Sequence, residues 1–178
     1  LDGSLYRGAK PVLWSVVEKT ALADAEVEYK DHTSNTVYVK FKIIKSKINE
    51  LLNSSILIWT TTPWTIPGNR ALAYGKDIDY VLIRITSVND DSFAKVNDEI
   101  VIAKDLLDSV LTGCSISEIK TLKLFKGSDL EGAECLHPFN GHGYDFIVKA
   151  FEADFVTLEQ GTGIVHVAPG HGADDYNL

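Results

Sequence analysis

Hydrophobic and polar residues alternate along much of the chain, with apolar side chains at every second position. The alternation is clear over residues 37–43 and 81–86, where it predicts half-buried β-strands. Residues 56–59 are instead continuously apolar and are bounded by Ser54-Ser55 and Pro63, which predicts a strand buried on both faces near the centre of a sheet. Further strands are predicted over 99–103, 119–125, 144–151 and 163–168.

Helical patterns are fewer and shorter than strand patterns. Residues 104–111 carry apolar side chains at helical spacing before Gly113, and the alanine-rich stretch 20–26 predicts a second short helix. The polar stretch 86–97 predicts a surface loop or hairpin tip. We therefore predict a mainly β fold, a closed or nearly closed β-barrel-like sheet with short helical insertions, and α+β in its overall content.

Composition restricts the class of protein. The 178 residues, 45% hydrophobic and 24% charged, fit a single domain over 1–178. No apolar run reaches the roughly 20 residues of a membrane span, and Cys114 and Cys135 fit free thiols in the cytoplasm. The net charge of -8 argues against a broad nucleic-acid-binding surface. Because the chain starts at Leu1 and stops abruptly soon after Asp174-Asp175-Tyr176, we interpret it as a segment excised from a longer protein.

The segment 59–69 (WTTTPWTIPGN) places three hydroxyl groups at the end of the predicted central strand. Pro63 lacks an N–H donor and biases Thr62 to an extended conformation, so the chain must leave the sheet here. Threonine hydroxyls and freed N–H groups at such a point fit ribose hydroxyls or an ester carbonyl, with Trp64 as an apolar wall. The alternative is that threonine is simply a frequent strand residue and tryptophan a core anchor.

The segment 161–175 (GTGIVHVAPGHGADD) combines a histidine on a strand with carboxylates that follow a glycine-rich turn. On a strand, His166 shares a face with Ile164 and Ala168. Asp174-Asp175 fit the first turn of a helix, where carboxylates interact favourably with the helix dipole. The pattern fits a metal site, an acid–base pair or a site for a cationic group. The metal site is disfavoured because the histidines at 166 and 171 are separated by a Gly/Pro loop.

Other polar residues have simpler interpretations. His171 fits a solvated loop, Asp174 a helix cap, and His137 and His142 another loop rich in Pro, Asn and Gly. The sequence contains neither a phosphate-binding Gly-Lys-Ser/Thr loop nor a Gly-x-Ser-x-Gly nucleophile motif. The residues alone therefore leave a hydrolase and a binding module equally open.

The segments 59–69 and 161–172, with the stretches 10–14 (KPVLW) and 20–29 (TALADAEVEY), closely resemble the editing domain inserted into isoleucyl-tRNA synthetases, which are class Ia enzymes, in their bacterial form. Valyl and leucyl relatives carry Thr-Thr-Arg-Pro-Glu/Asp-Thr at residues 60–65, so Thr62 and Trp64 favour the isoleucyl family; a valyl or leucyl editing domain is the alternative. The chain lacks the cysteines common in the family near Trp14-Ser15, which affects no predicted pocket residue.

This resemblance implies hydrolytic proofreading, in which Val-tRNA(Ile) is hydrolysed while Ile-tRNA(Ile) is spared. Hydrolysis of valyl-adenylate by the same domain is a further option. One methylene is worth only ~1–3 kcal/mol in a binding pocket, and the isoleucine–valine pair is itself the standard illustration of this limit. The implied partners are the 3′-terminal aminoacyl-adenosine of tRNA(Ile) and the remainder of the synthetase in cis. The domain is expected to be monomeric without a cofactor or metal, while the parent enzyme uses ATP and Mg. The contrasting hypothesis is a non-catalytic module that binds aminoacyl-adenosine or an RNA 3′ end.

The resemblance also assigns roles to individual residues. Asp175 matches the aspartate that holds the substrate α-ammonium, while Thr65 and His166 match positions that line the side-chain pocket. Since no general base is evident, we expect a positioned water to attack the ester, with hydroxyl and N–H groups stabilising the oxyanion and a ribose hydroxyl assisting. The predicted catalytic group is Thr60, Thr61, Thr62, His166 and Asp175, and the predicted substrate-binding group is Trp64, Thr65 and Asn69.

Overall fold

The computed structural model describes residues 3–9, 11–31 and 33–178, so Lys10 of the stretch 10–14 lies outside the described residues. Strands dominate the described chain, which confirms the mainly β prediction. The strands are β1 (Trp14–Ser15), β2 (Thr20–Ala21), β3 (Val37–Lys45), β4 (Ser55–Thr60), β5 (Ala71–Tyr74), β6 (Asp79–Val88), β7 (Glu99–Ala103), β8 (Ile116–Lys126), β9 (Glu134–Leu136), β10 (Ile147–Glu152) and β11 (Ile164–Val167).

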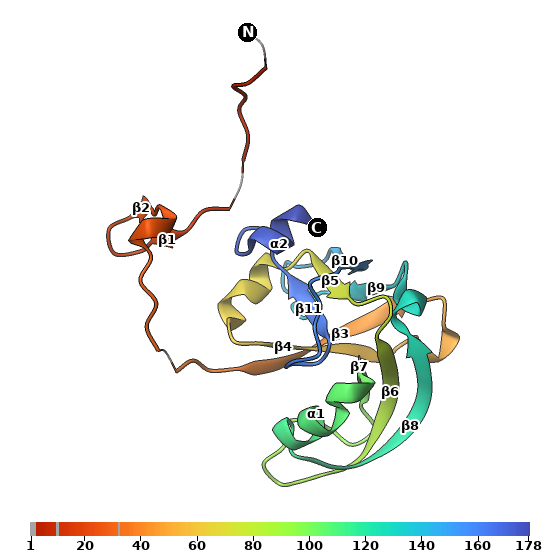
Figure 1. Ribbon diagram of the computed structural model, residues 1–178. Helices are drawn as coiled ribbons and strands as arrows, with labels where there is room; N and C mark the ends of the chain where they lie inside the picture. Colours follow the sequence, from red (N-terminus) through yellow and green to blue (C-terminus); the bar gives the residue numbers. More distant parts are fainter. Residues whose placement is uncertain (1–2, 10, 32) are drawn as a thin grey trace.

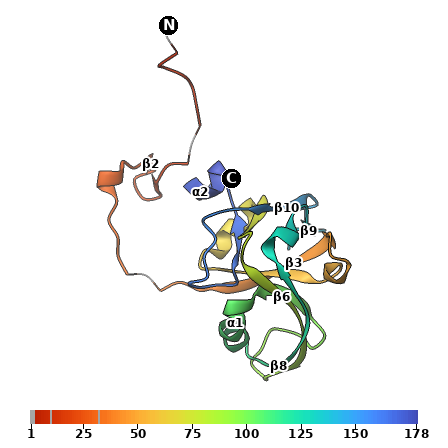
Figure 2. The same ribbon diagram turned by 45° about the vertical axis from the view of Figure 1, so that its right-hand side comes forward.

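Nine of these strands form one mixed sheet in the order β11-β5-β10-β9-β3-β4-β7-β6-β8 (Figure 1). The strongly curved sheet wraps around its own core, as the two views show (Figures 1 and 2). Its two end strands, β11 and β8, do not pair with each other, so the predicted barrel-like sheet is not a closed barrel. The parallel pairs β4–β7 and β5–β10 make it a mixed sheet rather than an antiparallel meander.

The core explains the strand assignments. Along β4, Ile56 and Ile58 point into one hydrophobic cluster with Leu72 and Leu82, whereas Leu57 points into a second cluster on the other face. Strand β4 lies between β3 and β7 inside the sheet, so the prediction of a central strand buried on both faces is confirmed. In β3 the alternation holds at its middle, where Phe41 is buried between two exposed lysines.

Helices are short compared with the strands. The α-helices are α1 (Leu107–Gly113) and α2 (Ala173–Asn177), and the 3-10 helices are η1 (Asp24–Glu26), η2 (Asn49–Leu51), η3 (Pro63–Gly68), η4 (Lys104–Leu106) and η5 (Gly127–Leu130). The predicted helix over 104–111 is confirmed as η4 followed by α1. The predicted helix over 20–26 is wrong, because β2 and the single turn η1 occupy it. None of its described residues is buried, so no apolar face stabilises a helix there.

Two segments extend from the body. The N-terminal part, with the β1–β2 hairpin, lies apart from the sheet (Figures 1 and 2) and exposes Trp14, Val16 and Val17. The predicted loop over 86–97 is the tip of the β6–β7 hairpin, which confirms a hairpin tip, although β6 continues to Val88. In the part of the chain that the structure describes, no helix is long and apolar enough to cross a membrane.

Candidate functional site

The segment 59–69 folds into a turn that leaves the sheet at Pro63, as its proline predicts. Strand β4 ends at Thr60, and Pro63 occupies the first position of η3. Both the backbone N–H and the hydroxyl of Thr65 donate to the carbonyl of Thr62, at 2.9 and 2.8 Å. The turn therefore holds the Thr62 and Thr65 side chains in a fixed relation.

Three threonine hydroxyls form a continuous chain along this turn. The oxygen Oγ1 of Thr60 accepts the N–H of Thr62 at 3.1 Å and lies 3.1 Å from Thr62 Oγ1. Thr62 Oγ1 lies 3.4 Å from Thr65 Oγ1. Thr60 and Thr65 are buried while Thr62 is half-buried, so the middle residue of the chain is the most exposed of the three.

The sheet topology brings the second segment against this turn. After η3 the chain enters β5, which pairs antiparallel with β11. Arg70 donates its backbone N–H to the carbonyl of Val167, so the start of β5 meets the end of β11. As a result Thr65 Oγ1 and His166 Nε2 lie 2.9 Å apart although 101 residues separate them in the chain.

His166 is a buried histidine. The hydroxyl proton of Thr65 is used by the Thr62 carbonyl, so Thr65 Oγ1 accepts a hydrogen bond from the Nε2–H of His166. The other ring nitrogen, Nδ1, is buried without a partner. Burial lowers the pKa of His166 below its usual range, although the Asp175 carboxylate opposes this shift. His166 is thus a buried imidazole that is held against the turn by Thr65.

Asp175 lies beside this histidine in the first turn of α2. Its Oδ2 accepts the backbone N–H of Ala168 at 2.8 Å, which ties the helix to the end of β11. Gly172 makes this close approach possible, because a Cβ at that position would lie 3.0 Å from the Asp175 carboxyl carbon. Asp175 is half-buried, so its other carboxylate oxygen is available to a cationic group.

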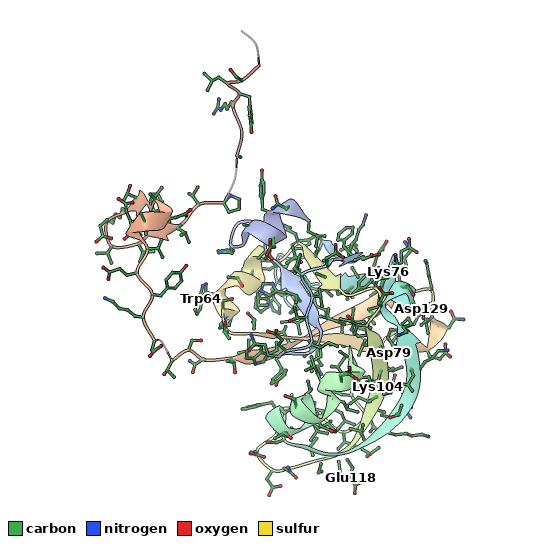
Figure 3. The ribbon with its side chains drawn as sticks, in the orientation of Figure 1. Trp64, Lys76, Asp79, Lys104, Glu118 and Asp129 are labelled. Atoms are coloured by element: carbon green, nitrogen blue, oxygen red, sulfur yellow. The ribbon has the colours of Figure 1, made fainter. Side chains whose placement is uncertain are left out.

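The remaining predicted residues have different environments. Thr61 is exposed, and its carbonyl accepts a hydrogen bond from the Ser34 hydroxyl at 3.1 Å. Trp64 projects outward from η3 (Figure 3) and is 64% exposed, so it is not a core anchor. Asn69 is fully buried and donates to the Ala71 carbonyl, while its Oδ1 has no partner. A substrate contact by Asn69 therefore stays a prediction.

Three other histidines differ in how fully the sequence predicts their environment. His142 is exposed in a loop, as expected, and exposed His171 lies against η3, because a Cβ on Gly68 would be 3.3 Å from its ring. His137 also lies in a loop, as predicted, but it is buried and reaches the carbonyl of Ile66 in η3. Its aromatic neighbours Phe139 and Tyr144 are the signal in the sequence that indicates burial.

Other places in the molecule lack the features of this site. Among residues 3–9, 11–31 and 33–178, no three His, Cys, Asp or Glu side chains are close enough to hold a metal ion, and the absence of a metal stays a prediction. A recess of about 600 Å³ lies between the end of α1 and the β6–β7 hairpin tip, lined by Tyr38, Leu57, Ile100 and Cys114. None of the predicted site residues lines this recess.

The buried histidines predict a loss of stability in mild acid. Burial lowers the pKa of both His137 and His166 below the usual 6.5. As the pH falls below about 6.5, the unfolded chain binds protons that the folded chain does not, so the free energy of unfolding decreases. Hydrogen bonds from lysines lower the pKa of Glu50 and Glu131. These carboxylates therefore change the free energy of unfolding only below their usual pKa of 4.5.

Thermal unfolding between pH 7.5 and 5.0 measures this effect. The Tm should fall with pH in the wild type and less steeply in His166→Asn, while the exposed-site control His142→Asn should follow the wild type. An equal slope in wild type and His166→Asn would contradict a contribution from the buried imidazole.

Comparisons with known proteins agree with the sequence resemblance. The family model for class I tRNA synthetases (I, L, M and V) matches residues 1–165. An isoleucine–tRNA ligase of Pelagibacter ubique (strain HTCC1062) is 56% identical over 99% of this chain. One of Gluconobacter oxydans (strain 621H) is 50% identical over 100% of it. The chain spans only 19% of each relative, about a fifth of their length.

Solved structures share the fold at low sequence identity. The crystal structure of GlLeuRS-CP1 covers 80% of this chain, and 58% of its own chain is matched, with a TM-score of 0.61 and 16% identity. The P. knowlesi cytosolic leucyl-tRNA synthetase editing domain covers 79% of this chain, and 59% of its own is matched, with a TM-score of 0.58 and 13% identity. Together with the family match over residues 1–165, this likeness leads to one conclusion: the chain belongs to the class I tRNA synthetases and has the fold seen in their editing domains.

Proposed function

We propose that this chain is the editing segment of an isoleucine–tRNA ligase, which hydrolyses valine esterified to tRNA(Ile) and spares the isoleucine ester. The observation that carries the proposal is the 2.9 Å contact between Thr65 and His166, which joins the two predicted motif segments into one site. Asp175 stands beside this contact, tied to Ala168. The buried Thr65–His166 pair, the threonine hydroxyls and the Asp175 carboxylate therefore lie close together, and these groups suit the binding of an aminoacyl ester.

The chemistry follows from these groups. The Asp175 carboxylate fits the α-ammonium of the aminoacyl group through a charge-assisted hydrogen bond. The buried Thr65 and His166 fit the walls around a short side chain, and Thr60 and Thr62 offer hydroxyl donors to the developing oxyanion. A water oxygen bonds to the ester carbonyl carbon, and the bond from that carbon to the ribose oxygen breaks. The products are free valine and tRNA with a free terminal hydroxyl.

The direct test uses the intact synthetase that contains this chain. Incubation with Val-tRNA(Ile) should release valine, while Ile-tRNA(Ile) should stay esterified over the same time. Val-tRNA(Ile) that is bound but not hydrolysed would favour the alternative of a non-catalytic module for the aminoacylated 3′ end. Preferential hydrolysis of Thr-tRNA(Val) or a misacylated tRNA(Leu) would instead favour a valyl or leucyl editing domain.

Gly172 offers a test of the carboxylate position. Its φ of -137° allows alanine, but the added Cβ would lie 3.0 Å from the Asp175 carboxyl carbon and push the carboxylate away. We expect Gly172→Ala to lower the rate of Val-tRNA(Ile) hydrolysis about fivefold to tenfold, as for one weakened hydrogen bond. Gly170→Ala is the matched control, because nothing lies within 4 Å of its Cβ. Equal rates in both variants would exclude this role of Gly172.

The proposed partners follow from the same assignment. Trp14, Val16 and Val17 on the β1–β2 hairpin are more than half exposed, and an isolated two-stranded hairpin is only marginally stable in water. We propose that the remainder of the synthetase contacts this hairpin in cis and that the editing segment acts as one domain on the 3′-terminal adenosine in the cytoplasm. ATP and Mg belong to the synthetic reaction elsewhere in the parent enzyme, and this segment works without a cofactor.

A further inference from the structure

His137 connects the β9–β10 loop to the turn that carries Thr65. It follows directly on β9, is 1% exposed, and stacks on Tyr144 with ring centroids 4.8 Å apart and planes 15° apart. The rings of Phe41, Phe139 and Phe146 surround it on other sides. This packing gives the imidazole one fixed orientation.

The hydrogen bonds of His137 determine which nitrogen carries its proton. The backbone N–H of Phe139 donates to Nδ1 at 3.1 Å, so Nδ1 is the acceptor and Nε2 carries the proton. Nε2 lies 3.0 Å from the Ile66 carbonyl and donates to it. The same carbonyl accepts the backbone N–H of Asn69, which closes η3. His137 thus donates to the carbonyl at the centre of the turn.

A second contact holds the end of the same turn against the same aromatic cluster. The Arg70 guanidinium carbon lies 4.8 Å from the ring centroid of Phe146. Arg70 also donates from Nη1 to the Asn69 carbonyl at 2.6 Å. These contacts from the His137 cluster hold η3 against the sheet, together with the buried Ile66 side chain and the Thr65–His166 contact.

We propose that His137 is a positioning residue for the editing site: by holding the Ile66 carbonyl, it sets the position of Thr65 against His166 and so the discrimination between valine and isoleucine esters. This inference rests on the proposed function. Thr65 directly precedes Ile66, and its hydroxyl is the atom that meets His166 at 2.9 Å. A shift of the turn would therefore move one wall of the pocket relative to the other.

The test compares three substitutions in the intact synthetase. His137→Phe keeps an aromatic ring but removes the donor, His137→Gln places an amide donor near the position of Nε2, and His137→Asn carries the same amide on a shorter side chain. We expect His137→Phe and His137→Asn to lower kcat for Val-tRNA(Ile) about tenfold with a smaller change in KM, and to reduce the ratio of valine to isoleucine ester hydrolysis. His137→Gln should restore most of both quantities.

Hydrogen exchange gives a readout that does not depend on activity. The amides of Thr65 and Asn69 should exchange faster in His137→Phe and His137→Asn than in wild type or His137→Gln, and His142→Phe in the same loop is the exposed control. Unchanged exchange of these amides and an unchanged valine-to-isoleucine ratio, with only a lower Tm, would overturn the inference. If His137→Phe does not fold, the comparison of Gln with Asn decides the same question. A wild type that hydrolyses no Val-tRNA(Ile) would refute the proposed function, whereas the exchange result would still judge the positioning role.

Discussion

Replacement of Asp175 by asparagine should reduce hydrolysis of Val-tRNA(Ile) by about 10- to 150-fold, the loss of one hydrogen bond to a charged group worth ~1.5–3 kcal/mol. Asparagine has nearly the same shape and its amide oxygen can still accept the N–H of Ala168, now 2.8 Å from Oδ2. The substitution therefore removes the negative charge while α2 stays in place. Single-turnover deacylation of Val-tRNA(Ile) by the intact synthetase measures the effect.

The neighbouring carboxylate supplies a matched control. Asp174 lies in the same first turn of α2 but is exposed, whereas Asp175 is half-buried. Asp174→Asn should therefore hydrolyse Val-tRNA(Ile) at the wild-type rate. Wild-type activity in Asp175→Asn would show that another group holds the α-ammonium.

The sequence pattern identified long strands better than short ones. Alternation or continuous burial predicted β3, β4 and β6, because each of them is long enough for its pattern to emerge. Strands β5 and β9 were not predicted, since the short segments ALAY and ECL do not alternate between apolar and polar residues. Their pairing with distant strands, rather than local preference, makes them strands.

The curvature of the sheet depends on information that no local pattern contains. The barrel-like prediction came from the number of short strands, but closure requires the two end strands to pair. Within the described part of the chain, β8 pairs only with β6, and β11 pairs only with β5. The predicted helix over 20–26 is absent because local helix propensity alone does not stabilise so short a helix, and no apolar face there packs against the body.

The sequence predicted the two motifs of the candidate site, but it did not predict that they lie next to each other in the fold. Pro63 correctly indicated where the chain leaves β4, and the glycine-rich stretch after His166 correctly indicated the turn that ends its strand. Their contact depends on β5, the strand that the sequence did not reveal. His137 was missed because Pro138 and Gly141 nearby are typical of loops, although its ring lies within the core.

In the proposed function, the contact between these two motifs forms the wall that rejects isoleucine. The imidazole of His166 is 8% exposed and is held by Thr65, so it cannot move aside without breaking the 2.9 Å hydrogen bond. On the opposite face of β11, Val165 is 37% exposed and points away from this contact. Substitutions of His166 and Val165 can therefore distinguish a change in the pocket from a general disturbance of strand β11.

Replacement of His166 by alanine should allow hydrolysis of Ile-tRNA(Ile), because it opens space where the additional methylene of isoleucine is excluded. One methylene in a pocket corresponds to roughly 10- to 200-fold in discrimination, so we expect Ile-tRNA(Ile) hydrolysis to rise by up to that factor. Val165→Ala should spare Ile-tRNA(Ile) as the wild type does, and the Tm of both variants reports on folding. If folded His166→Ala still spares the isoleucine ester, the imidazole does not form the excluding wall, and the discrimination must arise at Thr65 or in the placement of the ester itself.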